Sequence, residues 1–284
     1  MPTNKQRRQA AQRRLQRQLE RREELARKRR TRLLIGVTVV AVLAVVGAAL
    51  IITNLGDDDS STTASPTTSS APAGDPASSA AATATNADGT VACNFVPDDS
   101  GNTNLTDVGT PPDAANTPTT GTSTLRMSTG QGDLTLTLDR AGAPCAASSF
   151  TYLASQGFFD GSPCHREVNQ ATFGVLQCGD PTGTGQGGPS YKFGQEVSAE
   201  TTYPRGTIAM ANSGQPNSTG SQFFLCFTDT QLSPDYTAVG TVDEAGLAVL
   251  DQIAAAGNDG SFEPSPGGGA PNTPVTITSM TVVG

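Results

Sequence analysis

Residues 206–224 read GTIAMANSGQPNSTGSQFF, and this stretch decides the fold. It contains two informative runs, Met210-Ala211-Asn212 and Gly220-Ser221-Gln222-Phe223-Phe224, separated by a polar segment rich in turn-forming residues. Upstream, Cys164-His165-Arg166 is followed by Leu176-Gln177-Cys178-Gly179-Asp180. Together these segments place one arginine, several amide side chains and several apolar groups within one small β-rich domain.

The remaining pattern of residues 123–284 indicates one domain with short strands and two helices. Alternating apolar residues at 125–127 and 134–138 flank Gly130-Gln131-Gly132, which predicts a β-hairpin. Pro144 opens a predicted helix that ends near Gly157, and a second helix is predicted over residues 244–255. This pattern favours a mainly β fold, a closed β-barrel capped by two α-helices. The other strands are predicted at residues 175–178, 207–211, 222–227, 237–242 and 275–283.

The charges of the chain are divided between two parts of opposite sign. Residues 1–32 hold 13 basic and three acidic side chains, whereas residues 33–284 hold five basic and 23 acidic ones. Residues 33–52 contain no charge and only Thr38 as a polar residue. This apolar run is long enough for a transmembrane helix. The positive-inside rule then predicts a cytoplasmic N-terminus and an extracytoplasmic C-terminal domain on a single-pass cell-membrane anchor. A cleaved signal peptide is the alternative.

Residues 53–122 are dominated by Ser, Thr, Ala, Pro, Gly and Asp. Such a composition buries too little apolar surface to offset the conformational entropy of the chain, so we predict a disordered linker here. Cys93, Phe95 and Val96 are the exceptions, and they are candidates for docking on the domain. The basic segment 1–32 contains no aromatic residue to stack on bases, so no nucleic-acid partner is expected.

Several classes of chemistry are disfavoured by what the sequence lacks. His165 is the only histidine and the cysteines form no C-x-x-C pair, so neither a zinc site nor any other metal site is predicted. No G-x-S-x-G nucleophile motif occurs, and His165 is interpreted as structural. Residues 183–188 match G-x-G-x-x-G, but Pro189 follows where a helix is needed, so this is a surface loop. No cofactor is expected.

Three separated motifs resemble the cyclophilins: residues 158–166, residues 176–181 and the opening stretch up to Phe224. They occur in the order of that family, and the resemblance covers roughly residues 123–283. It implies an eight-stranded barrel with two helices and peptidyl-prolyl cis–trans isomerase activity on proline-containing polypeptides. Arg166 corresponds to the catalytic arginine of the family. The substrate-binding positions that the resemblance implies are Phe173, Val175, Gln177, Ala211, Asn212, Gln222, Phe224, Leu232 and Tyr236.

The chain departs from the family pattern at the pocket. The segment between Arg166 and Gln177 is longer than in familiar members, and Gly174 occupies the place of an expected aromatic residue. Either Phe173 fills that place through a bulge or this wall of the pocket is open. Tyr236 stands where the family has a histidine, and Gln231 stands where it has a tryptophan, which disfavours tight cyclosporin binding.

The five cysteines all follow the predicted membrane segment, where disulfides are plausible and the odd count leaves at least one unpaired. The cyclophilin-like arrangement implies that Cys164 and Cys178 lie on neighbouring strands, close enough to pair. Cys93 then pins the end of the linker to Cys145, and Cys226 stays free. Unpaired buried cysteines are the alternative.

Two functions are compatible with these residues. The first is a membrane-anchored isomerase that assists the folding of exported or cell-surface proteins. The alternative is a membrane-tethered module or chaperone that binds proline-containing segments with little turnover. The oligomeric state is not indicated by the sequence.

Overall fold

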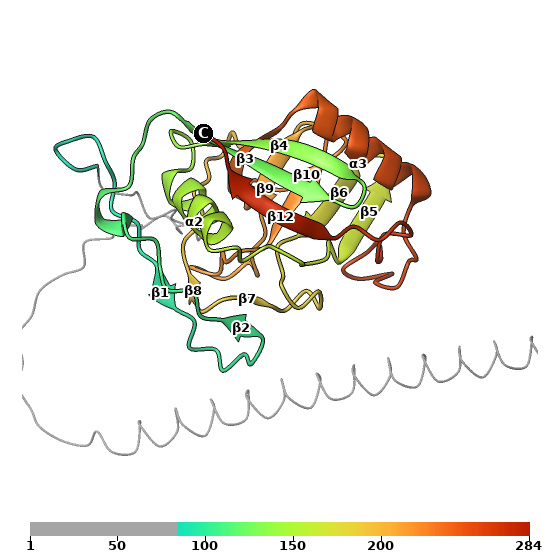
Figure 1. Cartoon of the computed structure of the whole chain (residues 1–284), viewed down its shortest axis with the longest axis horizontal. Helices are drawn as coiled ribbons and strands as arrows, with labels where there is room; N and C mark the ends of the chain where they lie inside the picture. The colour runs from blue at the N-terminus through green and yellow to red at the C-terminus, as the bar shows by residue number, and fades with distance from the viewer. Residues whose placement is uncertain (1–84) are drawn as a thin grey trace, which may run out of the picture. The chain divides into compact units, whose positions relative to one another are not determined.

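The computed structural model describes residues 85–284 (Figure 1). The predicted transmembrane segment and basic N-terminal segment lie outside the described residues. No helix within the described range is long and apolar enough to cross a membrane. The helical elements are η1 (Ala114–Asn116), α2 (Pro144–Ser155) and α3 (Glu244–Ala256). The strands are β1 (Val96–Pro97), β2 (Leu105–Thr106), β3 (Thr122–Thr129), β4 (Gly132–Asp139), β5 (Arg166–Gln170), β6 (Phe173–Cys178), β7 (Gly188–Pro189), β8 (Tyr191–Lys192), β9 (Thr207–Met210), β10 (Phe223–Cys226), β11 (Ala238–Val242) and β12 (Ile277–Val282).

Eight strands form one curled antiparallel sheet in the order β12-β3-β4-β11-β9-β10-β6-β5 (Figure 1). The two edge strands, β12 and β5, share no ladder, so the closed barrel predicted from the sequence is wrong: the sheet is a curled half-barrel. The outer edge of β5 has another partner, because Glu167 and Gly269 exchange two backbone hydrogen bonds of 2.7 and 3.0 Å. The start of β12 does reach the segment before β5, because Gly161 N–H donates to the carbonyl of Ile277 at 2.7 Å and Ile277 N–H donates to the carbonyl of Ser162 at 2.9 Å. These contacts do not continue as a ladder along β5.

The main core is built by alternation along the strands and by one face of each helix. On β3 and β4 every second side chain is fully buried, as the apolar pattern predicted. Aromatic rings link helix and sheet: the ring centroid of Phe223 on β10 lies 4.8 Å from that of Phe150 on α2 and 5.8 Å from that of Phe159. Burial of these rings holds α2 against the sheet and contributes heavily to stability.

The helix ends follow from local chemistry. Pro144 occupies the first turn of α2, where its missing N–H costs nothing. The carboxylate of Glu196 accepts hydrogen bonds from the N–H groups of Cys145 and Ala146 at 3.0 and 2.8 Å, so a distant side chain caps this helix. α3 begins after Asp243, whose carboxylate accepts from the N–H of Gly246 at 2.9 Å.

Residues 85–122 are ordered, which corrects the predicted disordered linker 53–122 over this part; residues 53–84 lie outside the described range. β1 pairs with β8, and β2 pairs in parallel with β7. A disulfide joins Cys93 to Cys145 on α2. The ring of Phe95 meets those of Tyr191 and Phe193 at centroid distances of 5.4 and 5.5 Å. A covalent link and one aromatic anchor thus order a segment whose composition is that of a linker.

Candidate functional site

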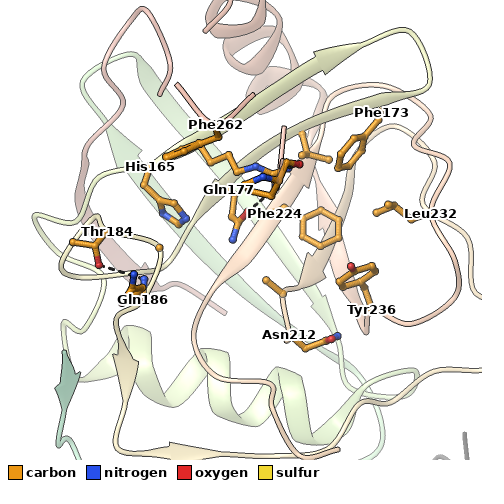
Figure 2. A pocket seen from close by; sticks show the side chains of 15 residues that line it. His165, Phe173, Gln177, Thr184, Gln186, Asn212, Phe224, Leu232, Tyr236 and Phe262 are labelled. Atoms are coloured by element: carbon orange, nitrogen blue, oxygen red, sulfur yellow. Dashed lines mark hydrogen bonds between the residues drawn. The ribbon is translucent and has the colours of Figure 1, made fainter. Parts of the chain in front are cut away.

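A cavity of about 610 Å³ opens beside β5, β6 and β10 (Figure 2). Nine of the ten site residues predicted from the sequence line it: Arg166, Phe173, Val175, Gln177, Ala211, Asn212, Phe224, Leu232 and Tyr236. The tenth, Gln222, lines an adjoining cavity of about 400 Å³ that shares Gln177, Ala211 and Asn212 with the first. The structure therefore brings the predicted set together across two joined cavities.

The floor of the cavity is apolar and separate from the main core. Phe224, which is 6% exposed, packs in a second cluster with Val175 and Ala209, against which Leu232 and Tyr236 lie partly buried. Figure 2 shows Phe224, Leu232 and Tyr236 gathered on one side of the pocket. Because successive side chains of a strand point to opposite faces, Phe223 enters the main core while Phe224 faces the pocket. The site thus offers an apolar seat large enough for a small ring.

Arg166 stands beside this seat on β5, directly opposite Gln177 on β6. Its Nη1 donates to Gln177 Oε1 at 3.0 Å, its Nε to the carbonyl of Gly267 at 2.9 Å and its Nη2 to the carbonyl of Pro266 at 2.8 Å. The guanidinium carbon lies 5.9 Å from the ring centroid of Phe173. Burial lowers the pKa of Arg166 from its ordinary value, but an arginine remains cationic in a protein.

The amide side chains form a chain of hydrogen bonds leading away from Arg166. Gln177 Nε2 donates to Gln222 Oε1 at 3.0 Å, and Gln222 Nε2 donates to the carbonyls of Gly185 and Gly187 at 3.0 and 3.1 Å. The glycine-rich loop is held in turn by the buried Asp180, whose carboxylate accepts from three backbone N–H groups of residues 182–186. The interpretation of this loop as a plain surface loop is therefore incomplete, because residues 184–186 of the loop line the cavity.

Asn212 is fixed at the rim of the cavity, at the point where β9 has ended (Figure 2). Its Nδ2 donates to the carbonyl of Asp235 at 2.9 Å, and its Oδ1 accepts from the N–H of Gly214 at 2.9 Å. These two contacts hold the backbone of the Ala211–Asn212 segment beside the apolar seat. An arginine, two glutamines and an ordered backbone edge therefore surround one apolar pocket, an arrangement suited to an extended peptide.

Comparison with known proteins agrees with this geometry. Residues 124–282 match the family model described as cyclophilin type peptidyl-prolyl cis-trans isomerase/CLD. The chain belongs to the cyclophilin family. The protein named probable peptidyl-prolyl cis-trans isomerase B of Mycobacterium leprae is 45% identical over 183 residues, which are 60% of each chain. The protein of the same name in Mycobacterium tuberculosis is 46% identical over 166 residues, 54% of this chain and 52% of its own length.

Other relatives of this cyclophilin domain cover more of their own length. A peptidyl-prolyl cis-trans isomerase of Helicobacter pylori is 42% identical over 130 residues, which are 45% of this chain and 77% of that protein. A crystal structure of a cyclophilin type isomerase of Cryptosporidium parvum has a TM-score of 0.51 and 29% identity, covering 58% of this chain and 99% of that one. The chain spans only 52–60% of the two mycobacterial relatives.

The wall that the sequence left ambiguous is closed by Phe173. The cyclophilin hairpin of β5 and β6 turns at residues 171–172, and its ladder is regular, so Phe173 reaches the cavity without a bulge. Gly174 is required beside it, because a Cβ there would lie 2.4 Å from Thr228 Oγ1. The aromatic side chain is therefore supplied one residue earlier than the family pattern suggested.

Six lining residues of the cyclophilin pocket were not predicted: His165, Thr184, Gly185, Gln186, Phe262 and Pro266. Residues 184–186 belong to the glycine-rich loop, whereas Phe262 and Pro266 belong to the loop between α3 and β12. His165 lies beside Phe262 (Figure 2). Phe262 and Pro266 lie far from the motifs in sequence, in a glycine- and proline-rich stretch without periodicity. No spacing in the sequence connects this stretch to the site.

Four of the five cysteines form two disulfides. Cys164 is bonded to Cys178 and Cys93 to Cys145, whereas Cys226 is free and buried. Burial raises the pKa of the Cys226 thiol to about 12, so it is un-ionised near neutral pH. The Cys164–Cys178 disulfide is next to the site, since Cys164 is two residues from Arg166 and Cys178 directly follows Gln177.

Removing the Cys164–Cys178 disulfide is expected to destabilise the cyclophilin domain. The bond closes a loop with a sequence separation of 14. Restricting a loop of that size in the unfolded chain is worth about 3 kcal/mol in the chain-entropy model. The free energy of unfolding of the Cys164→Ala/Cys178→Ala variant, measured by urea denaturation, should fall by about this amount. An unchanged unfolding midpoint with an unchanged slope would contradict the expectation.

Glu167 introduces a pH dependence into the stability of the domain. Its side chain is fully buried, and neither carboxylate oxygen has a hydrogen-bond partner within residues 85–284. Burial raises the pKa of Glu167 from 4.5 to about 7. Because the folded pKa is the higher one, the folded state is favoured below pH 4.5, and that contribution is lost as the pH rises through about 7.

The Glu167→Gln variant should remove this pH dependence, since glutamine stays neutral. We expect the unfolding free energy of the variant to exceed that of the wild type increasingly between pH 4.5 and 8. Parallel denaturation series at several pH values measure the difference. Two stability curves that stay parallel over this range would show that Glu167 does not titrate with a raised pKa.

Proposed function

We propose that the chain is a peptidyl-prolyl cis–trans isomerase. The observation that carries the proposal is the position of the Arg166 guanidinium, bonded to Gln177 and lining the same cavity as the apolar floor at Phe224. The family membership and the names of the relatives support it. A cyclophilin of Cryptosporidium parvum was crystallised in the presence of the dipeptide Ala-Pro, which supports X-Pro peptides as the ligand class.

The chemistry needs no nucleophile, base or cofactor. Rotation about an X-Pro bond faces a barrier of roughly 18–20 kcal/mol, because amide resonance is lost as the bond twists. A catalyst must therefore bind the twisted amide better than the planar one.

Each part of the pocket has a role in this proposal. The proline ring sits on Phe224, against Val175 and Leu232, while the backbone of the peptide runs along Ala211–Asn212. As the peptide bond twists, the proline nitrogen becomes pyramidal and its lone pair is released from amide resonance. The Arg166 guanidinium then donates a hydrogen bond to this lone pair. Such a donor is more favourable in the transition state than in the ground state, so it lowers the barrier. Gln177 holds the guanidinium and contacts the flanking backbone.

The test is a protease-coupled assay with an Ala-Pro peptide and the full chain. The proposal predicts that the slow phase of cis-peptide cleavage accelerates in proportion to the concentration of the chain. No acceleration by a folded chain would contradict the proposal and favour the binding module instead.

We further propose that the substrates are exported or cell-surface proteins. The uncharged run 33–52 and the basic segment before it support a membrane anchor with the domain outside. Two disulfides support an oxidising compartment. Intact cells carrying the full chain should lose the domain to added protease, and the chain should fractionate with membranes. A chain found in the soluble cytoplasmic fraction would contradict this proposal.

A further inference from the structure

The loop between α3 and β12 forms a side of the site that the motifs do not include. Residues 258–270 of this loop reach the edge of β5 at Gly269, which exchanges two backbone hydrogen bonds with Glu167. The contact is so close that a Cβ on Gly268 would lie 2.0 Å from the carbonyl oxygen of Glu167, and Gly268 has a φ of 76°. Only glycine fits this position, so the loop is attached tightly to the strand that carries Arg166.

Within this loop, a closed turn presents two carbonyl groups to Arg166. The backbones of Phe262 and Gly268 are joined by a hydrogen bond of 3.0 Å, and Gly267 N–H donates to the carbonyl of Phe262 at 3.1 Å. One side chain completes the turn: Glu263 Oε1 accepts from the N–H of Gly268 at 2.7 Å. The carbonyl groups of Pro266 and Gly267, inside this turn, accept from Nη2 and Nε of Arg166.

These contacts leave a defined part of the guanidinium for substrate. An arginine side chain has five N–H donors in a fixed plane. The two loop carbonyls and Gln177 Oε1 take three of them, one on each nitrogen. One N–H on Nη1 and one on Nη2 have no other assigned acceptor in the described residues, and Arg166 lines the cavity. The loop therefore selects which donors of the planar group remain available.

We propose that Glu263 is a positioning residue for Arg166: by closing the 262–268 turn, its carboxylate aims the carbonyl groups of Pro266 and Gly267 at the guanidinium. This inference rests on the proposed isomerase function and deepens it. Glu263 itself is not among the residues that line the cavity, so it acts through Arg166 and does not contact substrate. A guanidinium held from three sides needs no reorientation when the peptide bond twists, which is the condition for strong transition-state stabilisation.

The experiment compares three single variants of the full chain with the wild type. Glu263→Ala removes the acceptor for Gly268 N–H, whereas Glu263→Gln keeps an oxygen at the same place but loses the charge. Ser265→Ala is the matched control in the same loop, because Ser265 is exposed and its side chain makes no hydrogen bond among the described residues. The readouts are kcat and KM for an Ala-Pro peptide, the melting temperature, and the NMR signal of the Arg166 Nε–H.

Glu263→Ala should lower kcat about three- to tenfold with KM unchanged. The variant loses roughly one hydrogen bond, and the resulting misplacement of Arg166 weakens a contact made only in the transition state. Its Arg166 Nε–H signal should shift and exchange faster with water. Ser265→Ala should match the wild type in all readouts, and Glu263→Gln, which keeps the acceptor oxygen, should retain most of the kcat that Glu263→Ala loses. The inference is overturned if Glu263→Ala keeps full kcat, if it changes KM alone, or if Glu263→Gln loses as much as Glu263→Ala, which would indicate a charge effect.

The two proposals fail in distinguishable ways. If the folded wild-type chain accelerates no isomerisation, the proposed function fails. The Arg166 Nε–H signal then still tests the positioning, because it reports the hydrogen bond to Gly267 without any turnover. An identical signal in wild type and Glu263→Ala would overturn the inference in that case as well.

Discussion

Replacing Arg166 with alanine is expected to lower kcat/KM for X-Pro isomerisation by about 10²–10³-fold, the usual cost of removing one preorganised donor. The guanidinium is the one cationic group lining the described cavity, and alanine leaves nothing there to donate to the proline nitrogen. The fold should persist, since Arg166 is only partly buried and its loop carbonyls can be hydrated. Because the donor acts in the transition state, the loss should appear in kcat more than in KM.

Arg166→Lys is the matched variant that separates charge from geometry. Lysine keeps the positive charge but lacks the planar set of donors that contacts Gln177 and the two loop carbonyls at once. We expect it to recover little of the lost kcat. Full activity in Arg166→Ala, with an unchanged melting temperature, would exclude the role given to this residue.

Phe223→Ala should destabilise the cyclophilin domain more than the loss of the Cys164–Cys178 disulfide does. The Phe223 side chain is 0% exposed, and its ring packs against those of Phe150 and Phe159. Truncating a buried phenylalanine costs about 3–5 kcal/mol, from lost transfer free energy and from the cavity left behind. Urea denaturation should show this loss as a lower unfolding midpoint with little change in slope.

The neighbouring Phe224→Ala provides the comparison, because it removes the same side chain from the opposite face of β10. Phe224 borders the open pocket, so its removal enlarges a space that solvent already reaches and should cost less stability. Its expected effect is a higher KM, since the proline ring loses its floor. Equal loss of stability in the two variants, with KM unchanged in Phe224→Ala, would contradict the division between core and pocket.

The regular elements could be predicted because their signals are local. Pro144 marks the start of α2 and the alternation of apolar residues marks β3 and β4, and both hold in the structure. The positions lining the pocket came from the cyclophilin resemblance, since neither periodicity nor spacing relates Arg166 to Phe224. Their grouping around one cavity follows from the sheet order, in which β10 lies beside β6 and β6 beside β5.

The features that were missed depend on contacts without a sequence signal. The prediction of a closed barrel was wrong because β12 meets only the segment before β5, whereas Glu167 on β5 pairs with Gly269 of the loop between α3 and β12. Such backbone pairing leaves no side-chain pattern in the sequence. The carbonyl groups that hold Arg166 could not be predicted for the same reason. Residues 85–122 have the composition of a linker, and their order depends on the disulfide between Cys93 and Cys145 and on the packing of Phe95. Glu196 caps a helix that begins about 50 residues earlier in the chain.

The most direct test of the central claim is NMR exchange spectroscopy of an Ala-Pro peptide with catalytic amounts of the full chain. This measurement reports the interconversion of cis and trans peptide and the binding of the peptide in the same sample. We predict cis–trans exchange that is accelerated from tens or hundreds of seconds to below one second, and that returns to the unaided rate with Arg166→Ala. Peptide binding by the folded chain without accelerated exchange would contradict the claim that the chain is an isomerase.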